Sequence, residues 1–192
     1  HSAVAAGTGL VMPGPDLSGP AIANLIVDEK VTVAAGVPTI WQAVLPEMKG
    51  RPHVLRAIPC GGSAVPRALS EGFRTQLGVP LLQAWGMTET SPVAAVSTIL
   101  GSEANLSEDA KADLRTMVGR TLFGVEGRVV EPGTTTPLPW DGETSGELQC
   151  AGPWVTGTYY NDERAGESFT DDGWLRTGDV ATVDPYGRIR LV

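Results

Sequence analysis

The spacing of apolar residues changes along the chain, and this change constrains the fold more than any other sequence feature. Between residues 18 and 117, segments with helical spacing alternate with short, continuous apolar runs. Beyond Gly119, short alternating pieces are separated by turns rich in Gly, Pro and Thr. We therefore predict an α/β region followed by a β region, with a boundary near residue 118.

The first region, residues 1–118, has the signals of a partial parallel α/β subdomain. Helices are predicted at residues 18–29, from Pro38, from Pro66 and at about 107–117. Ser18 and Ser107 are the expected N-caps, and Gly78 is expected to end the third helix. Buried strands are predicted at residues 31–35, 54–59 and 81–85. Helices that alternate with such strands favour parallel pairing.

The second region, residues 119–192, has the pattern of a small antiparallel β-barrel subdomain. Residues 127–130, 146–150 and 188–192 are short strand candidates. The turn residues between them are typical of antiparallel connections.

Charge and composition exclude several classes of function. The 192 residues carry 14 Lys and Arg against 22 Asp and Glu, a net charge of −8, which disfavours binding to nucleic acid. The two cysteines, Cys60 and Cys150, are too few for a disulfide framework and indicate a reducing, cytoplasmic compartment. No apolar run approaches the roughly 20 residues of a transmembrane segment.

Three segments carry residue types that could contact a ligand. Residues 60–66 place two glycines between a strand and a helix, where backbone groups can approach a flat ligand. Residues 83–92 follow a strand and bring together an aromatic ring, a glycine, a hydroxyl and a carboxylate. Residues 173–179 end in Thr-Gly-Asp. Taken singly, each segment is also explained as an ordinary turn or loop, with Trp85 in the core.

In order and spacing, the three segments together resemble the adenylate-forming superfamily of acyl-CoA synthetases, luciferases and peptide-synthetase adenylation domains. Residues 61–66 look like its adenine-rim loop, and residues 83–89 are similar to its Gln-x-(Tyr/Trp)-Gly-(Met/Leu)-Thr-Glu signature. Residues 146–161 and 172–179 resemble the two motifs that follow. Trp85 in place of tyrosine most resembles the fatty-acyl-CoA synthetase branch.

The resemblance implies a reaction in two steps. A carboxylate attacks the α-phosphate of ATP to give an acyl-adenylate and pyrophosphate, and the CoA thiol then displaces AMP. By the match, Trp85 stacks on adenine, and the main chain of Gly61, Gly62 and Ser63 forms the rim of the adenine site.

The remaining site residues are also implied by the match. Thr88 is expected to bind the α-phosphate and Glu89 to ligate Mg²⁺, so that these two residues are the catalytic candidates. Asp179 is expected to accept hydrogen bonds from both ribose hydroxyls. Gly86 is expected to let the acyl carbonyl approach the backbone.

The sequence also departs from the family pattern. Family members have several hundred residues, with a phosphate loop upstream and a lysine-bearing domain downstream. No Ser/Thr/Gly-rich loop ending near a lysine precedes residue 60, and Val192 comes just before the expected hinge. We therefore expect a fragment of the large N-terminal domain that is inactive by itself.

Two alternatives remain open at this stage. One is a non-enzymatic truncated module that binds a nucleotide or a partner protein. The other is an adenylation domain for an amino or aryl acid. A truncated chain is also expected to self-associate through the surface that truncation exposes.

Overall fold

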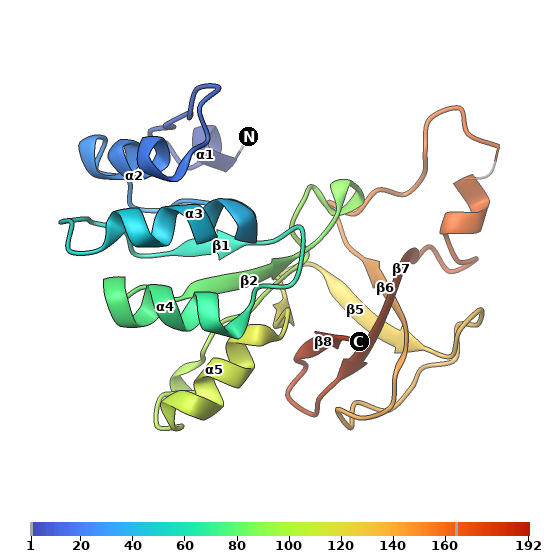
Figure 1. Ribbon diagram of the computed structural model, residues 1–192. Helices are drawn as coiled ribbons and strands as arrows, with labels where there is room; N and C mark the ends of the chain where they lie inside the picture. Colours follow the sequence, from blue (N-terminus) through green and yellow to red (C-terminus); the bar gives the residue numbers. More distant parts are fainter. Residues whose placement is uncertain (1, 164) are drawn as a thin grey trace. The chain divides into compact units, whose positions relative to one another are not determined.

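The computed structural model of the protein describes residues 2–163 and 165–192. The chain forms two compact units, the first ending at Leu81 and the second extending from Leu82 to Val192 (Figure 1). The domain boundary that the sequence predicts near residue 118 stays a prediction.

Three helices of the first unit begin and end close to their predicted positions, namely α2 (Gly19–Asp28), α3 (Pro38–Met48) and α4 (Arg67–Leu77). A short helix, α1 (Ser2–Ala5), was not predicted. The Ser18 hydroxyl accepts a hydrogen bond from the Ala21 N–H, as expected of an N-cap. Gly78 ends α4 with a left-handed conformation (φ 73°), which a glycine adopts without strain. Within the described residues, no helix has the length and apolar character needed to cross a membrane.

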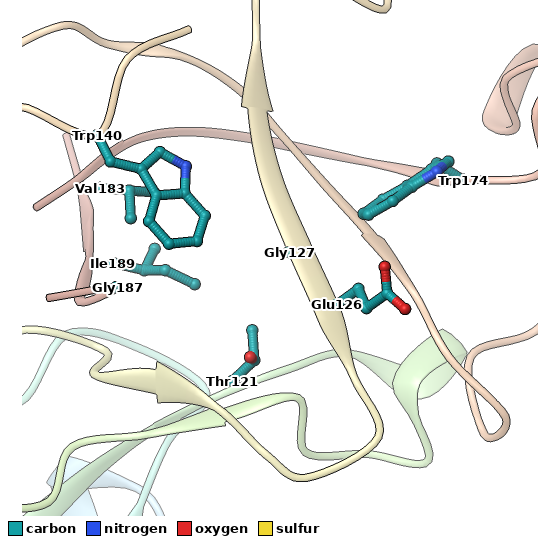
Figure 2. A pocket seen from close by; sticks show the side chains of 8 residues that line it. All are labelled: Thr121, Glu126, Gly127, Trp140, Trp174, Val183, Gly187 and Ile189. Atoms are coloured by element: carbon teal, nitrogen blue, oxygen red, sulfur yellow. The ribbon is translucent and has the colours of Figure 1, made fainter. Parts of the chain in front are cut away.

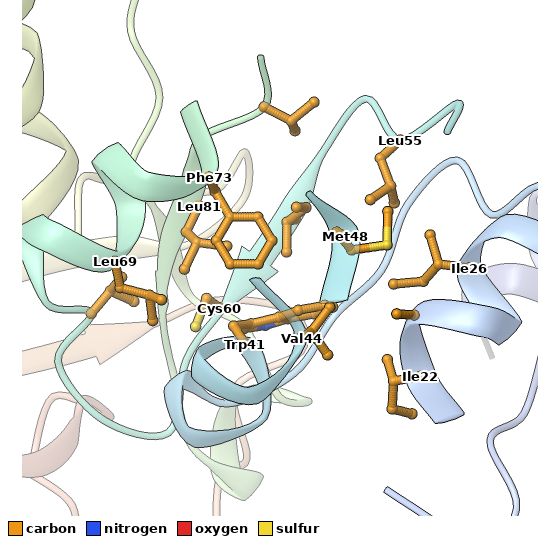
Figure 3. Close-up of a cluster of buried hydrophobic side chains, with 14 residues drawn as sticks. Ile22, Ile26, Trp41, Val44, Met48, Leu55, Cys60, Leu69, Phe73 and Leu81 are labelled. Carbon is orange, nitrogen blue, oxygen red and sulfur yellow. The ribbon is translucent and has the colours of Figure 1, made fainter. Parts of the chain in front are cut away.

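The core of the first unit is built around Trp41 of α3 (Figure 3). The Trp41 ring meets Phe73 of α4 edge-on, with ring centroids 5.9 Å apart. Gly19 lies so close to α3 that an added Cβ would stand 2.1 Å from the Ala43 carbonyl oxygen. A side chain at residue 19 would therefore force α2 and α3 apart.

The strand predictions for the first unit are only partly correct. The parallel pairing is confirmed by bridges between Val33 and Ala57 and between Gly36 and Cys60. Residues 31–35, however, are not a buried strand, because they form only an isolated bridge and Val33 is 46% exposed. The second predicted strand is shorter than expected, since β1 covers Ile58–Cys60.

The second unit contains two antiparallel arrangements of strands. In the first, β2 (Leu81–Trp85) pairs with β3 (Ala95–Val96), and β3 pairs with β4 (Arg120–Thr121). Between β3 and β4 the chain forms a short 3₁₀ helix, η2 (Gly101–Glu103), and α5 (Glu108–Thr116). The predicted N-cap of this helix is confirmed, because the Ser107 hydroxyl accepts a 3.1 Å hydrogen bond from the Ala110 N–H.

The rest of the second unit is a four-stranded antiparallel sheet in the order β5-β6-β7-β8 (Figure 1). Its strands are β5 (Glu126–Val130), β6 (Gly146–Ala151), β7 (Leu175–Val183) and β8 (Ile189–Leu191). The predicted antiparallel β region is therefore confirmed. It is an open, curled half-barrel, since no ladder joins β5 to β8 among the described residues.

A buried ion cluster joins the helical insertion of the second unit to its sheet. The Glu103 carboxylate, 6% exposed as a residue, accepts hydrogen bonds from Arg120 (2.8 Å) and Arg188. Arg188 also bonds Asp184 at 2.7 Å. Burial by itself raises the pKa of Glu103, but the Leu100 N–H and the two guanidinium groups outweigh it and hold the pKa at about 2.

We predict that Glu103→Gln destabilises the protein by roughly 2–4 kcal/mol at pH 7, because it leaves two guanidinium groups facing an uncharged amide. The folded pKa of Glu103 lies below its ordinary value of 4.5. Its stabilising effect is therefore present above about pH 4.5 and is lost as the pH falls toward 2. Urea midpoints measured from pH 7 to pH 2.5 should converge for the wild type and the variant.

The exposed Glu143 provides the control for this measurement, because its side chain contacts no cation in the described structure. Glu143→Gln should match the wild type at every pH. A gap between Glu103→Gln and the wild type that stays constant with pH would contradict the assignment to the ion cluster.

Candidate functional site

Residues 86–93, which contain most of the motif of residues 83–92, lie in the loop that connects β2 to β3. After Trp85 the chain runs through a 3₁₀ helix, η1 (Thr88–Thr90), and returns as β3, where the Ala94 N–H bonds the Trp85 carbonyl at 2.9 Å. The Thr90 hydroxyl, fully buried, closes the loop from inside with contacts of 2.9 Å to the Met87 N–H and to the Pro92 carbonyl. The loop therefore lies at the carboxyl end of β2, as predicted.

Gly86 is required by this loop for a steric reason. A Cβ added there would stand 2.0 Å from the Pro92 carbonyl oxygen and 2.8 Å from the Thr90 hydroxyl. Gly86 is exposed, so that a ligand could approach its backbone closely.

We predict that Gly86→Ala destabilises the second unit by about 2–3 kcal/mol, because the loop must open to accommodate the methyl group. Gly101→Ala is the matched control, since nothing lies within 4 Å of a Cβ at that position. Denaturant unfolding of both variants checks this. Equal midpoints for the two would contradict the proposed close approach.

The Trp85 side chain ties this loop to the half-barrel sheet. Trp85 is 8% exposed as a residue and belongs to the apolar core of the second unit. The indole N–H donates a 2.8 Å hydrogen bond to Oδ2 of Asp179, 94 residues further along the chain. The structure therefore brings together two of the predicted site residues. The edge of the Trp85 ring is used for this bond, and stacking of its face on a nucleotide base stays a prediction.

Asp179 is aimed at Trp85 by a bulge in β7. Between the pairs Glu147–Val180 and Gln149–Arg176, one residue of β6 lies opposite three residues of β7, 177–179. Gly178 takes a left-handed conformation (φ 78°) that other residues rarely adopt. Bulges of this kind turn a side chain out of the regular alternation of a strand.

Thr177 stabilises the bulge on both sides. Its hydroxyl donates a 2.7 Å hydrogen bond to the Leu148 carbonyl and accepts one from the Asp179 N–H at 3.2 Å. All three residues of the Thr-Gly-Asp sequence therefore help to direct the Asp179 carboxylate toward Trp85. Oδ1 of Asp179 has no hydrogen-bond partner among the described residues.

We predict that Trp85→Phe costs about 1–3 kcal/mol of stability, because it removes a hydrogen bond to a charged, half-buried acceptor. A double-mutant cycle with Asp179→Ala should give a coupling energy of about 1 kcal/mol or more. Trp140→Phe, at a half-exposed ring, is the matched control and should cost about 0.5 kcal/mol or less. Additive effects of Trp85→Phe and Asp179→Ala would contradict the coupling.

Glu89 lies in the same loop and is held by the segment between β6 and η3 (Ala165–Ser168). Its carbonyl accepts a 2.8 Å hydrogen bond from the Thr156 N–H. Its carboxylate oxygen Oε1 accepts a 2.7 Å hydrogen bond from the hydroxyl of Tyr159. This bond to the Glu89 carboxylate, followed by burial, raises the pKa of Tyr159, so that its hydroxyl stays protonated at neutral pH.

Sequence reasoning did not assign a role to Tyr159. It belongs to the motif of residues 157–161, but the motif contains two adjacent tyrosines and the spacing does not say which one faces inward. The structure decides this, because Tyr159 contacts Glu89 while Tyr160 is 98% exposed.

Thr88 is exposed at the start of η1. Its hydroxyl makes no hydrogen bond with the described residues. Gly86, Thr88 and Glu89 thus present a backbone, a hydroxyl and a carboxylate along one short loop.

The predicted rim residues Gly61, Gly62 and Ser63 belong to the first unit. They form the turn between β1 and α4, where the Gly61 N–H bonds the Gly36 carbonyl at 3.2 Å. Gly62 has φ 82°, and a Cβ there would touch Val37 at 3.3 Å. The glycine is therefore needed for the turn itself, and its contact with a nucleotide stays a prediction.

The two cysteines have no features of a nucleophile. Both are buried and free, and burial raises the pKa of each thiol to about 11. They remain protonated at neutral pH and serve as core residues.

A separate pocket of about 200 Å³ lies in the half-barrel (Figure 2). Trp140 and Trp174 stand on its two sides, and the Glu126 carboxylate lies near Trp174. It is lined by Thr121, Glu126, Gly127, Trp140, Trp174, Val183, Gly187 and Ile189. The predicted site residues are not among them. Trp174 is already covered by Arg128, whose guanidinium carbon lies 4.3 Å from the ring centroid.

The oxygen atoms that Glu89 and Thr88 offer fit a cation whose other ligands come mainly from a bound nucleotide. Within residues 2–163 and 165–192, no group of three His, Cys, Asp or Glu side chains forms a metal cage. Mg²⁺ is commonly bound by one or two carboxylates together with substrate phosphates and water. A single carboxylate beside the Thr88 hydroxyl agrees with this mode.

Comparison with known proteins identifies the family. A family model described as "AMP-binding enzyme" matches residues 1–160, most of the chain. The chain belongs to the AMP-binding enzyme family. The resemblance that the motifs indicated is thereby confirmed, and the β2–β3 loop described above lies inside the matched range of this AMP-binding enzyme family.

Curated relatives of this AMP-binding chain include CoA ligases. It is 40% identical over 190 residues to a medium-chain-fatty-acid–CoA ligase of Ectopseudomonas oleovorans, covering 97% of this chain and 34% of that protein. It is 38% identical over 194 residues to a 3-methylmercaptopropionyl-CoA ligase of Ruegeria pomeroyi, covering 100% and 35% respectively. The chain thus spans about a third of the length of the curated relatives it matches.

Solved structures of the same kind of enzyme share the fold. The o-succinylbenzoate CoA synthetase of Bacillus subtilis, solved in complex with its acyl-adenylate intermediate, matches with a TM-score of 0.82 and 28% identity. The match covers 98% of this chain and 36% of that one. The α/β followed by β fold class of the AMP-binding chain is therefore confirmed.

Proposed function

We propose that the chain carries part of the nucleotide site of an ATP-dependent acyl-CoA synthetase that acts on a fatty acid or a similar carboxylate. The observation that carries this proposal is the hydrogen bond between Trp85 and Asp179. It gathers an aromatic side chain and a carboxylate beside the loop that holds Thr88 and Glu89. Membership of the AMP-binding enzyme family and the likeness to CoA ligases support the same function.

In this proposal Asp179 recognises the ribose of the nucleotide. Oδ2 is occupied by the Trp85 N–H, while Oδ1 has no partner among the described residues. An ionised carboxylate oxygen has lone pairs for two hydroxyl donors. Trp85 offers its ring to adenine, and the turn of Gly61, Gly62 and Ser63 supplies the rim of the adenine site.

Residues of the loop after β2 contact the α-phosphate and the acyl group of the substrate. The Thr88 hydroxyl donates to the α-phosphate, and the backbone of Gly86 allows the acyl carbonyl to approach. Glu89 would hold a Mg²⁺ ion together with the nucleotide phosphates, and the ion would supply charge neutralisation for the leaving pyrophosphate. These residues act by orientation and charge stabilisation, because none of them forms a covalent bond to the substrate.

The reaction proceeds by two displacements. A carboxylate oxygen of the acid bonds to the α-phosphorus while the bond to the β-phosphate oxygen breaks, which releases pyrophosphate. The sulfur of CoA then bonds to the acyl carbon while the bond to the AMP oxygen breaks. The thiol proton is lost to solvent, and acyl-CoA and AMP are released.

Further proposals concern the setting of this site. The two unpaired cysteines support a reducing, cytoplasmic location. The likeness to a medium-chain-fatty-acid–CoA ligase supports a role in fatty acid metabolism. Exposed apolar residues such as Phe123 support self-association of the isolated chain.

We predict that the 192-residue chain binds AMP weakly, with a dissociation constant on the order of 1 mM, because it holds only part of the site. It should prefer AMP over 2′,3′-dideoxy-AMP by about ten-fold, since the ribose hydroxyls bond a charged acceptor. Asp179→Asn should abolish this preference. Isothermal titration calorimetry of the wild type, Asp179→Asn and the control Asp171→Asn checks all three statements.

The same 192-residue chain should release no pyrophosphate from ATP and octanoate, because its residues 1–60 contain no Ser/Thr/Gly-rich loop ending near a lysine. Measurable release would contradict this expectation. The absence of any heat with AMP at millimolar concentration would overturn the proposed nucleotide site.

A further inference from the structure

The two carboxylate oxygens of Glu89 are in different situations. Oε1 accepts the 2.7 Å hydrogen bond from the Tyr159 hydroxyl. Within residues 2–163 and 165–192, no donor reaches Oε2. A carboxylate with one oxygen bonded in this way still has its second oxygen available for a cation.

Tyr159 is itself held in position by its surroundings. Its ring is half-buried and tilted against Phe169, with ring centroids 6.0 Å apart. The segment that carries it is fastened to the β2–β3 loop by the Thr156 N–H on the Glu89 carbonyl (2.8 Å) and by the Ser91 hydroxyl on the Trp154 carbonyl (3.0 Å). These contacts hold the Tyr159 ring in place, so that its hydroxyl faces Glu89.

We propose that Tyr159 is a positioning residue for the magnesium site: its hydroxyl fixes the rotamer of Glu89, so that Oε2 is presented to a cation on the nucleotide phosphates. This inference rests on the proposed function. A flexible glutamate side chain loses rotamer freedom when it ligates a metal. Tyr159 removes that freedom before the nucleotide binds, which is preorganisation of a ligand group.

The hydrogen bond also favours single-oxygen ligation. Mg²⁺ requires a nearly octahedral arrangement of six oxygens at short distances. A glutamate that has one oxygen committed to a tyrosine offers the cation one oxygen and leaves the other positions to phosphate and water. The tyrosine thereby sets how Glu89 binds as well as where it lies.

The test is the removal of one oxygen atom by Tyr159→Phe in the 192-residue chain, followed by calorimetric titration with AMP, with ATP in EDTA and with MgATP. We expect the affinity for MgATP to fall about three- to ten-fold, the loss of one charge-assisted hydrogen bond. The affinities for AMP and for metal-free ATP should stay within about two-fold of the wild type.

The adjacent tyrosine provides the matched control. Tyr160 is 98% exposed, so that Tyr160→Phe should leave all three affinities unchanged. Glu89→Gln should remove the gain in affinity that Mg²⁺ gives to ATP, and adding Tyr159→Phe to it should lower the MgATP affinity no further, because the two side chains act as one unit.

Three outcomes would overturn the inference. If Tyr159→Phe binds MgATP like the wild type, the hydroxyl does not position Glu89. If AMP and MgATP lose affinity equally, Tyr159 has a general structural role. If the wild type binds AMP but gains nothing from Mg²⁺, the metal role of Glu89 fails while the ribose and adenine contacts stand.

Failure of the proposed function has a different signature. In that case the wild-type chain binds neither AMP nor ATP, and the positioning role is overturned with it. A double-mutant cycle of Tyr159→Phe and Glu89→Gln in urea unfolding then still reports whether the hydrogen bond contributes to stability.

Discussion

The hydrogen bond from Trp85 to Asp179 is the interaction on which the site of the second unit depends. It connects the end of β2 with the bulge of β7, two places that are far apart in the sequence. The donor is part of the apolar core and the acceptor is partly exposed. The polar side of the site is therefore anchored to the apolar core of the unit, which is the arrangement that preorganised sites require.

The contacts of Glu89 extend the same principle to the other end of the loop. There the anchor is a tyrosine whose ring packs against Phe169 and whose hydroxyl meets the carboxylate. In both cases an aromatic side chain is fixed by packing and carries a single polar group that contacts an acidic residue. Aromatic rings suit this task, because they bury a large area with few rotatable bonds.

Helices α2 to α5 could be predicted from the sequence because local signals mark them. Ser107 and Gly78 are local features whose effect does not depend on the rest of the chain. The strands were harder, because burial of a run such as residues 31–35 depends on what pairs with it. Strands of two residues, such as β3 and β4, are too short to produce any periodicity.

The site residues also divide into those that local sequence indicates and those whose placement depends on distant segments. Trp85, Thr88 and Glu89 are neighbours in sequence, so that one motif named them together. The approach of Asp179 to Trp85 depends on a bulge that no spacing rule indicates, since it arises from the pairing of two strands. Tyr159 was inside a recognised motif, but its direction depends on how the segment after β6 folds back.

The bulge in β7 also has a consequence for how the sheet and the site can vary independently. It places three residues opposite one, so that the alternation of the strand stays in phase across it. Leu175 before the bulge and Ala181 and Val183 after it all face the core. An excursion of one residue would have reversed every side chain beyond it. Residues 177–179 can therefore change in chemical character while the side chains of β7 before and after the bulge still face the core.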